Sequence, residues 1–241
     1  MTARQELPEL LQHHFEHLQA SAISIEVLKQ RGYRSVLRKG ELGELGFSKS
    51  QQRVPGLLIP LWGVDGKVCG YQYRPDKPRL NARRKPIKYE TPYGASNSID
   101  CPRRCQGALS DPSIRLWILE GAKKADSLAS HGLTTISLNG VFGWRGKSKQ
   151  GGVIALGDWE SIAFKGHEVV LSFDSDAATN ENVALARSRL ARFFSSRGLA
   201  YRMASEGRLP TLKFGRRVVV PLAALQKMLE GTNSQGGTHD S

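Results

Sequence analysis

The sequence has little of several features that define whole classes of protein. It contains three cysteines among 241 residues, and these cannot form the disulfide framework of a small secreted domain. No run approaches the roughly 18 apolar residues that a membrane helix needs. The N-terminus, MTARQELPELLQHH, lacks the apolar stretch of a signal peptide. We therefore expect a cytoplasmic protein that makes no use of a membrane.

Acidic residues are also scarce, with 22 Asp and Glu against 35 Lys and Arg and a formal net charge of +13. The excess falls in two segments. Residues 74–104 carry nine basic and three acidic residues, and residues 187–217 carry nine basic residues and one acidic residue. Two basic zones in an otherwise near-neutral chain predict contact with a polyanion, and the expected partner is DNA, single-stranded or duplex.

The pattern of apolar residues divides the chain into five regions. We expect a helical N-terminal region over 1–50, a basic β-rich subdomain over 51–113, an α/β core over 114–200, a β-hairpin with a helix over 201–230 and a disordered tail over 231–241. Within the core, RLWILE, TTISL and HEVVLSFDSD have the composition of strands, and GAKKADSLASHG and NENVALARSRLARFFSSRG that of helices. Strands that alternate with helices predict an α/β fold with a parallel sheet and flanking helices.

Three carboxylates follow strands of this predicted sheet. Glu120 ends the first strand, and Asp174 and Asp176 end the third. Ligands of such sheets bind beyond the carboxyl ends of the strands, and residues i and i+2 of a strand face the same side. The pattern predicts Mg²⁺ ligation by the two aspartates and acid–base chemistry by Glu120. Acids after strands also serve as helix N-caps, which is the alternative.

Basic residues near these carboxylates are candidates for binding phosphate. Lys123 and Lys124 open the helix after Glu120, where the helix N-terminus also favours anions. Arginine outnumbers lysine in both basic zones and is the better partner for phosphate. From these zones we select a set of nucleic-acid-binding candidates: Arg74, Arg83, Arg84, Lys88, Arg208, Arg216 and Arg217.

Two pairs of residues suit a metal less well. His13 and His17 lie one helical turn apart, but no acidic or cysteine third ligand is near them in the sequence. Cys101 and Cys105 form a C-x3-C pair without two further ligands, so ordinary thiols are expected there.

The motifs EGAKKAD at 120–126 and FDSD at 173–176 resemble the Toprim fold of primases and topoisomerases. More narrowly, they resemble the Toprim-like DUF3854 domain found beside phage, plasmid and mobile-element replication proteins. The upstream phrases GLLIPLWGVDGKVCGYQYRPDKPR and KYETP resemble the segment that precedes that core, so the resemblance spans roughly residues 50–200. It implies an acid–base role for Glu120 and Mg²⁺ ligation by Asp174 and Asp176.

The tail after residue 200 has a different character. YRMASEGRLPTLKFGRRVVVPLAALQKMLEG resembles the second half of an excisionase-type, MerR-like winged helix-turn-helix. This resemblance implies a hairpin wing over 211–220 and a closing helix over 221–229, although the usual first helix is not recognisable. The alternative is a strand and helix that complete the main domain.

Two functions remain open at this stage. One is Mg²⁺-dependent, primase-like phosphoryl or nucleotidyl transfer on DNA, and the other is a non-catalytic, excisionase-like accessory protein that binds DNA through its basic surfaces. A haloacid-type phosphatase is disfavoured, because Ala178 stands where its motif needs Thr or Val. The chain has no G-x-x-x-x-G-K-[ST] loop, so any unwinding would come from a separate helicase or replication protein.

Overall fold

The structure is a computed structural model that describes residues 9–148, 150–164, 166–172, 184–186 and 188–194, together with the backbone of 212–214 and 217–219. The chain divides into two compact units. The first comprises Met1–Ala163 and His167–Leu190, and the second comprises Phe164–Gly166 and Ala191–Ser241. None of the helices in the described residues has the length and apolar character that crossing a bilayer requires.

The first unit begins with an antiparallel sheet of three strands, β1 (Arg34–Val36), β2 (Gly56–Trp62) and β3 (Val68–Pro75), in the order β1-β2-β3. β2 and β3 pair as an antiparallel hairpin within the region that the sequence predicts to be rich in β structure. Helices α1 (Gln12–Gln19) and α2 (Ile25–Arg31) pack their apolar residues with Leu57 and Ile59 of β2. Leu58 packs instead with residues of α3 (Lys39–Glu44) and the segment after it. β2 is a continuous apolar run because both of its faces are buried.

The N-terminal region contains a strand as well as the expected helices. α1, α2 and α3 all form, but Arg34–Val36 pairs antiparallel with β2. Gly32, with φ +79°, ends α2 and lets the chain turn back toward β2. A strand of three residues is too short to show an alternating apolar pattern in the sequence. β1 forms because it pairs with the edge of β2 that β3 leaves open.

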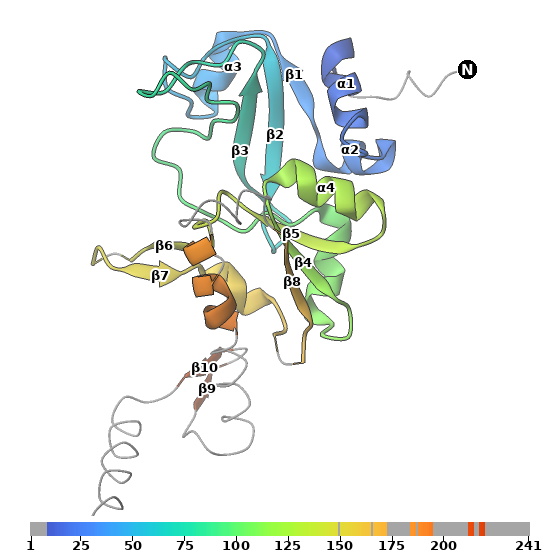
Figure 1. Cartoon of the computed structure of the whole chain (residues 1–241), viewed down its shortest axis with the longest axis vertical. Coiled ribbons are helices and arrows are strands. Elements are labelled where there is room, and N and C mark those ends of the chain that lie inside the picture. Colours follow the sequence, from blue (N-terminus) through green and yellow to red (C-terminus); the bar gives the residue numbers. More distant parts are fainter. Residues whose placement is uncertain are drawn as a thin grey trace, which may run out of the picture. The chain divides into compact units, whose positions relative to one another are not determined.

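A parallel sheet forms the centre of the first unit, as predicted. It comprises β4 (Leu116–Glu120), β5 (Thr134–Leu138) and β8 (Val169–Ser172), in the order β5-β4-β8. Helix α4 (Ala122–Ser130) connects β4 with β5 and buries Ala122, Ala125 and Ala129 along one face. Figure 1 shows α4 lying between this sheet and α2. Residues 184–186 and 188–194 are helical, which confirms part of the second predicted core helix.

The glycine-rich stretch after β5 contains structure that the sequence does not predict. Strands β6 (Arg145–Lys147) and β7 (Val153–Ala155) pair antiparallel, and the short helix η3 (Gly157–Ser161) follows. A second short helix, η2 (Arg103–Ser110), lies between the two sheets in sequence and carries Cys105. Cys101 and Cys105 are buried free thiols, as expected, and burial raises the pKa of each.

Asp100 joins the two sheets. Its backbone exchanges two hydrogen bonds with Ser137 of β5, at 3.0 and 2.7 Å, while the next residue donates its N–H to Trp62 O of β2 at 2.7 Å. The Asp100 side chain contacts Arg31, and Arg31 also donates to Asp126 of α4 at 2.8 and 2.6 Å. Tyr33 donates its hydroxyl to Asp126 at 2.7 Å. A buried network of charged groups therefore holds α2, α4 and both sheets together.

The second unit contains the hairpin predicted over residues 211–220. Strands β9 (Leu212–Phe214) and β10 (Arg217–Val219) pair antiparallel, with Arg217 opposite Phe214. The predicted tip residues Gly215 and Arg216 lie outside the described residues, as do the predicted closing helix over 221–229 and the tail over 231–241.

Candidate anion-binding active site

A cavity of about 500 Å³ lies at the carboxyl ends of β4 and β5. It has two walls. One comes from the turn after β4, the first turn of α4 and the end of β5. The other comes from β3 and the segment that pairs with it. Its lining residues are Gln72, Tyr89, Thr91, Glu120, Gly121, Lys123, Lys124, Leu138, Asn139 and Gly140.

The β3 wall is built by residues 89–91, which return along β3 after the basic loop. Tyr73 and Glu90 exchange two backbone hydrogen bonds of 2.8 Å each. The Glu90 carboxylate is buried and accepts bonds of 2.8 to 3.1 Å from Arg79. This anchoring sets Tyr89 and Thr91, the residues on either side of Glu90, in the cavity wall.

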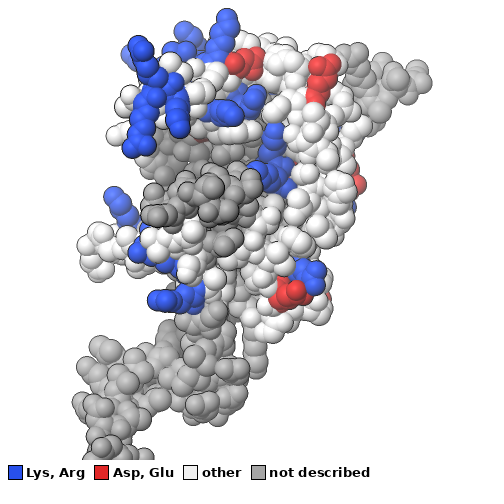
Figure 2. All heavy atoms as spheres, in the orientation of Figure 1, with Lys and Arg blue, Asp and Glu red and all other residues white. Residues whose placement is uncertain are grey.

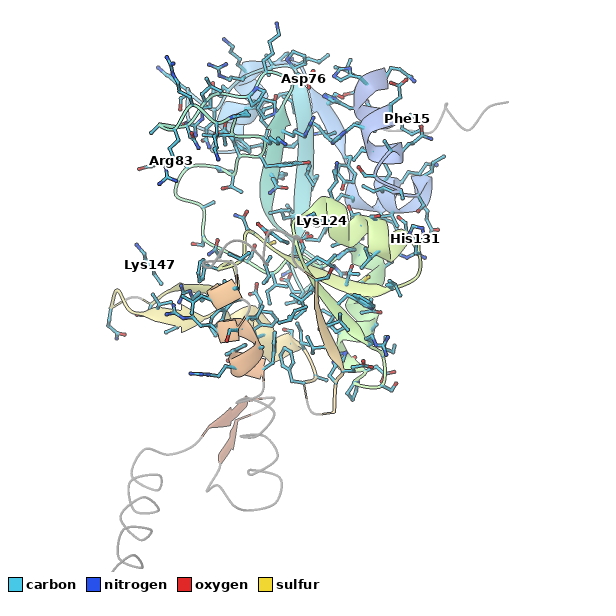
Figure 3. All side chains as sticks on the ribbon, viewed as in Figure 1. Phe15, Asp76, Arg83, Lys124, His131 and Lys147 are labelled. Atoms are coloured by element: carbon cyan, nitrogen blue, oxygen red, sulfur yellow. The ribbon has the colours of Figure 1, made fainter. Side chains whose placement is uncertain are left out.

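The other wall depends on a sharp turn directly after Glu120. Glu120 is the last residue of β4 and pairs with Leu138 of β5. Gly121 follows with φ +91° and ψ 135°, a conformation that residues with a side chain rarely adopt, and its N–H donates to Leu138 O at 3.1 Å. The turn starts α4 at once, so Lys123 and Lys124 share the cavity with Glu120. Figure 3 labels Lys124 at this end of α4.

Lys123, which lines this cavity, contacts His17, and the pKa values of both groups are lowered. Lys123 Nζ is 2.7 Å from His17 Nε2. Burial, with a contribution from Arg74, lowers the pKa of Lys123 to about 8. Burial and the charges of Lys123 and Arg74 lower the pKa of His17 to about 4. At neutral pH His17 is therefore neutral and accepts a hydrogen bond from Lys123 Nζ, and the charges of Lys123 and Arg74 stay uncompensated by this contact.

Arg74 completes the cationic group, which we call the cavity cations, namely Arg74 and Lys123. Its guanidinium lies over the ring of Tyr89, 5.9 Å from the centroid. Such stacking holds the guanidinium in place without neutralising it. Two positive charges beside a cavity with few neighbouring acids attract an anion, and phosphate is the biological anion that pairs best with Arg and Lys.

A second basic group stands on the loop between β3 and residue 89. Asn81 Oδ1 accepts from the backbone N–H groups of Arg83 and Lys85 at 2.9 and 3.0 Å, which orders the loop. Arg83, Arg84 and Lys88 are exposed, and none of them has an ion pair with the described residues. Figure 2 shows Lys and Arg side chains gathered over this part of the molecule, where Figure 3 labels Arg83.

The predicted site residues thus fall into three groups. Glu120, Lys123 and Lys124 line one cavity, and Arg74 acts on Lys123 there. Arg83, Arg84 and Lys88 belong to the exposed loop. The remaining candidates lie outside the described residues or, for Arg217, have only a described backbone: Asp174, Asp176, Arg208, Arg216 and Arg217.

Several cavity residues are missing from the sequence-based selection. Tyr89 and Thr91 belong to the phrase KYETP, which the family resemblance singled out without giving its residues a role. Nothing in the sequence around Gln72 indicates more than a place in a strand, so it was not predicted as a cavity residue. His17 was paired in sequence with His13 as a weak metal pair, whereas in the structure it contacts Lys123.

A family of known proteins matches the part of the chain that forms one wall of the cavity. Residues 106–206 match a family model described as a domain of unknown function, DUF3854. The resemblance inferred from the motifs extended upstream to about residue 50, but the matched segment begins after the β2–β3 hairpin and the basic loop. No curated protein matches the sequence.

Three solved structures are similar at low identity. The Aquifex aeolicus primase (zinc-binding and RNA polymerase domains) is 12% identical with a TM-score of 0.47, and the match covers 68% of this chain and 43% of that one. The DnaG catalytic core is 15% identical with a TM-score of 0.48, covering 72% and 58%. The DnaG primase catalytic domain bound to ssDNA is 14% identical with a TM-score of 0.45, covering 69% and 55%.

The chain thus spans about half the length of each of these three structures. Its similarity to the DUF3854 family is confined to residues 106–206, the segment that contains β4, α4, β5 and β8.

Proposed function

We propose that this chain is a primase-like, nucleic-acid-binding protein that transfers phosphoryl or nucleotidyl groups at the cavity beside Glu120. The observation that carries the proposal is the composition of that cavity. A strand-end glutamate and two lysines line it, and Arg74 adds a second uncompensated charge beside Lys123. An acid–base group next to an anion-binding pair is what phosphoryl transfer needs.

The side chains have separate tasks in this proposal. Lys123 and Arg74 bind the phosphate groups of an incoming nucleotide, and His17 holds the Lys123 ammonium by accepting a hydrogen bond from it. Glu120, at the edge of the sheet, takes the proton from the attacking hydroxyl. Tyr89 keeps Arg74 in place through its ring.

The cavity also suits Mg²⁺. Glu120, Gln72, Thr91 and Asn139 all line it and offer oxygen atoms, the donors that Mg²⁺ prefers, and Mg²⁺ typically takes one or two protein carboxylates with water and phosphate oxygens. When bound, Mg²⁺ would supply charge neutralisation for the phosphates and for the developing negative charge. We propose that Asp174 and Asp176 are the carboxylates that hold the ion, and that Glu120 is the acid–base group.

Chain reach supports the inclusion of the two aspartates. The described part of β8 ends at Ser172. Ser172 pairs with Leu119 of β4, and Glu120 is the residue directly after Leu119. Asp174 follows two residues later, and two residues span at most about 7 Å. This short separation in the sequence supports the proposal that Asp174 acts together with Glu120.

DNA is the proposed partner, with the exposed basic loop as its main contact. Arg83, Arg84 and Lys88 stand free of ion pairs with described residues and are spaced along an ordered loop, as phosphate contacts to a strand would be. In the second unit, we propose that Arg208, which precedes the wing-like hairpin in the sequence, and Arg216 and Arg217 of the hairpin add contacts. Unwinding would fall to a separate helicase in a mobile-element or phage replication module.

The test is nucleotide incorporation on a single-stranded template with Mg²⁺. We expect the wild type to extend or prime, and Glu120→Gln and Asp174→Asn to lose activity by at least about a hundredfold, since each removes a charge from the reacting centre. DNA binding, measured in parallel, should stay within about twofold. Full activity in both variants would refute the proposed site.

A second function has its own support in the basic loop. If the chain only binds DNA, as an accessory or regulatory protein, the loop arginines and the hairpin would act without turnover. The incorporation assay separates the two: salt-sensitive DNA binding together with no incorporation by the wild type would establish the binding function in place of the catalytic one.

A further inference from the structure

Two adjacent histidines and an aspartate, none of them among the cavity residues given above, meet elsewhere in the first unit. His13 Nε2 lies 2.8 Å from Asp76 Oδ2, and His14 Nε2 lies 2.7 Å from Asp76 Oδ1. The histidines are in the first turn of α1, and Asp76 follows β3 directly, 62 residues later than His14. Figure 3 labels Asp76 at the end of β3 that lies beside α1. The three ligand atoms lie within 4.8 Å of one another.

This convergence needs an explanation, because neighbouring residues of a helix normally point about 100° apart around its axis. Here both imidazoles turn toward the same carboxylate, with ring centroids only 4.2 Å apart. Two imidazole nitrogens and a carboxylate oxygen form a donor set typical of zinc sites that keep an open position.

Hydrogen bonds hold the His14 ring and the backbone of Asp76 in position. His14 Nδ1 lies 2.7 Å from Ser35 Oγ, and that oxygen also accepts from the backbone N–H of Leu11 at 2.8 Å. The backbone N–H of Asp76 donates to Pro55 O at 3.1 Å. Histidines that bind metals almost always have the second ring nitrogen held in this way, which sets the direction of the first.

Burial is uneven across the three residues. The His14 side chain is 1% exposed, that of Asp76 is 22% exposed and that of His13 is 57% exposed. One ligand is therefore built into the core of the first unit, while another faces solvent. An ion can enter from the solvent side and keep a coordination position open to water.

We propose that His13, His14 and Asp76 bind a divalent transition-metal ion of the zinc type, through the two Nε2 atoms and the carboxylate. The competing explanation is a pair of ordinary His–Asp hydrogen bonds, in which a proton occupies each position that the ion would bridge. The site is separate from the proposed Mg²⁺ chemistry, since it uses nitrogen donors and other residues.

The experiment titrates the full chain with Co²⁺, followed by visible absorption, and with Zn²⁺, followed by calorimetry. We expect one ion per chain at this site. His13→Ala and Asp76→Asn should each weaken binding by at least about tenfold, since each removes one of three ligands. His13 is exposed, so His13→Ala also tests the site without disturbing the core.

His131→Ala is the matched control. It removes an exposed histidine at the C-terminal end of α4 that is not one of the three proposed ligands. It should bind the ions like the wild type. Strong thiolate-to-cobalt absorption would assign the ion to cysteines and overturn the proposal. Absence of ion binding, or equal binding by wild type, His13→Ala and Asp76→Asn, would overturn it as well and leave the hydrogen-bonded pair.

Discussion

Helix α4 carries two charged residues one turn apart, Asp126 and Lys123, and the charges that surround them differ. Asp126 is fully buried and bonds to Arg31, which also contacts Asp100, so two carboxylates enclose one guanidinium. Lys123 is half-buried and contacts neutral His17. The charge of Arg74 helps to lower the pKa of Lys123, and no carboxylate of the described residues raises it. The first group balances positive with negative charge, and the second does not.

The difference separates a structural network from a binding site. A buried charge that is paired and hydrogen-bonded stabilises the arrangement of its neighbours, and removing one partner leaves the other unpaired at high cost. A cation held beside other cations is disfavoured in the folded state until an anion arrives. Burial, together with the charge of Arg74, lowers the pKa of Lys123, and the binding of an anion would relieve that cost.

The largest expected effect is on stability, from Asp126→Ala. This change removes the Asp126 carboxylate that accepts hydrogen bonds from the Arg31 guanidinium and the Tyr33 hydroxyl. We therefore expect a loss of about 3–5 kcal/mol in the free energy of unfolding. Urea unfolding followed by circular dichroism measures it. Lys123→Met on the same helix is the control and should leave stability unchanged or raise it. Similar losses in both variants would remove the distinction between the two groups.

The next effect is on anion binding, from Lys123→Met. Losing a charged hydrogen-bond donor costs about 1.5–3 kcal/mol, so the affinity for a nucleoside triphosphate should fall by about ten- to a hundredfold. Arg83→Gln, on the exposed loop, should change this affinity by less than about threefold. Fluorescence titration with a labelled nucleotide gives both values, and equal losses would argue that the cavity is not the anion site.

The pH dependence of that affinity sharpens the comparison. The pKa of Lys123 is about 8 in the free protein, and a bound anion raises it, so binding is accompanied by proton uptake above pH 8. Affinity should be nearly constant below about pH 7 and fall by up to about tenfold per pH unit above 8. Lys123→Arg, which stays charged, should show a flat profile. A steep profile in that variant would point to another titrating group.

The smallest effect concerns the exposed loop and appears only in the salt dependence. Each phosphate contact to a single strand contributes about 0.7 to the slope of log K against log salt. Replacing Arg83, Arg84 and Lys88 together by glutamine should lower that slope by about 2. Lys29→Gln on α2 serves as the control for loss of an exposed charge and should leave the slope within error. An unchanged slope in the triple variant would exclude the loop from the DNA contact.

The sequence predicted most of the local structure because that information is local. The alternation of strands and helices from Leu116 onward, the β2–β3 hairpin and the strand-end position of Glu120 all follow from short patterns. Three strands escaped prediction for the same reason. β1 has three residues, as have β6 and β7, so no period could develop in any of them.

The candidate site was predicted in part. Glu120, Lys123 and Lys124 were found because they adjoin a strand end that parallel sheets use for ligands. Tyr89 and Gln72 were missed, because they reach the cavity only through the pairing of residues 89–91 with β3. The sequence grouped Arg74 with Arg83, Arg84 and Lys88 in one basic zone, whereas in the structure Arg74 acts on Lys123 and the other three are exposed on the loop.

The amino-acid sequence by itself determined the order of the elements, the uneven distribution of charge and the glutamate at the end of β4. Only the tertiary structure decided which charges meet. Arg31 and Asp126 are 95 residues apart, His17 and Lys123 are 106 apart, and His14 and Asp76 are 62 apart. Contacts at such separations depend on the packing of whole helices against sheets, and neighbouring residues carry no trace of them.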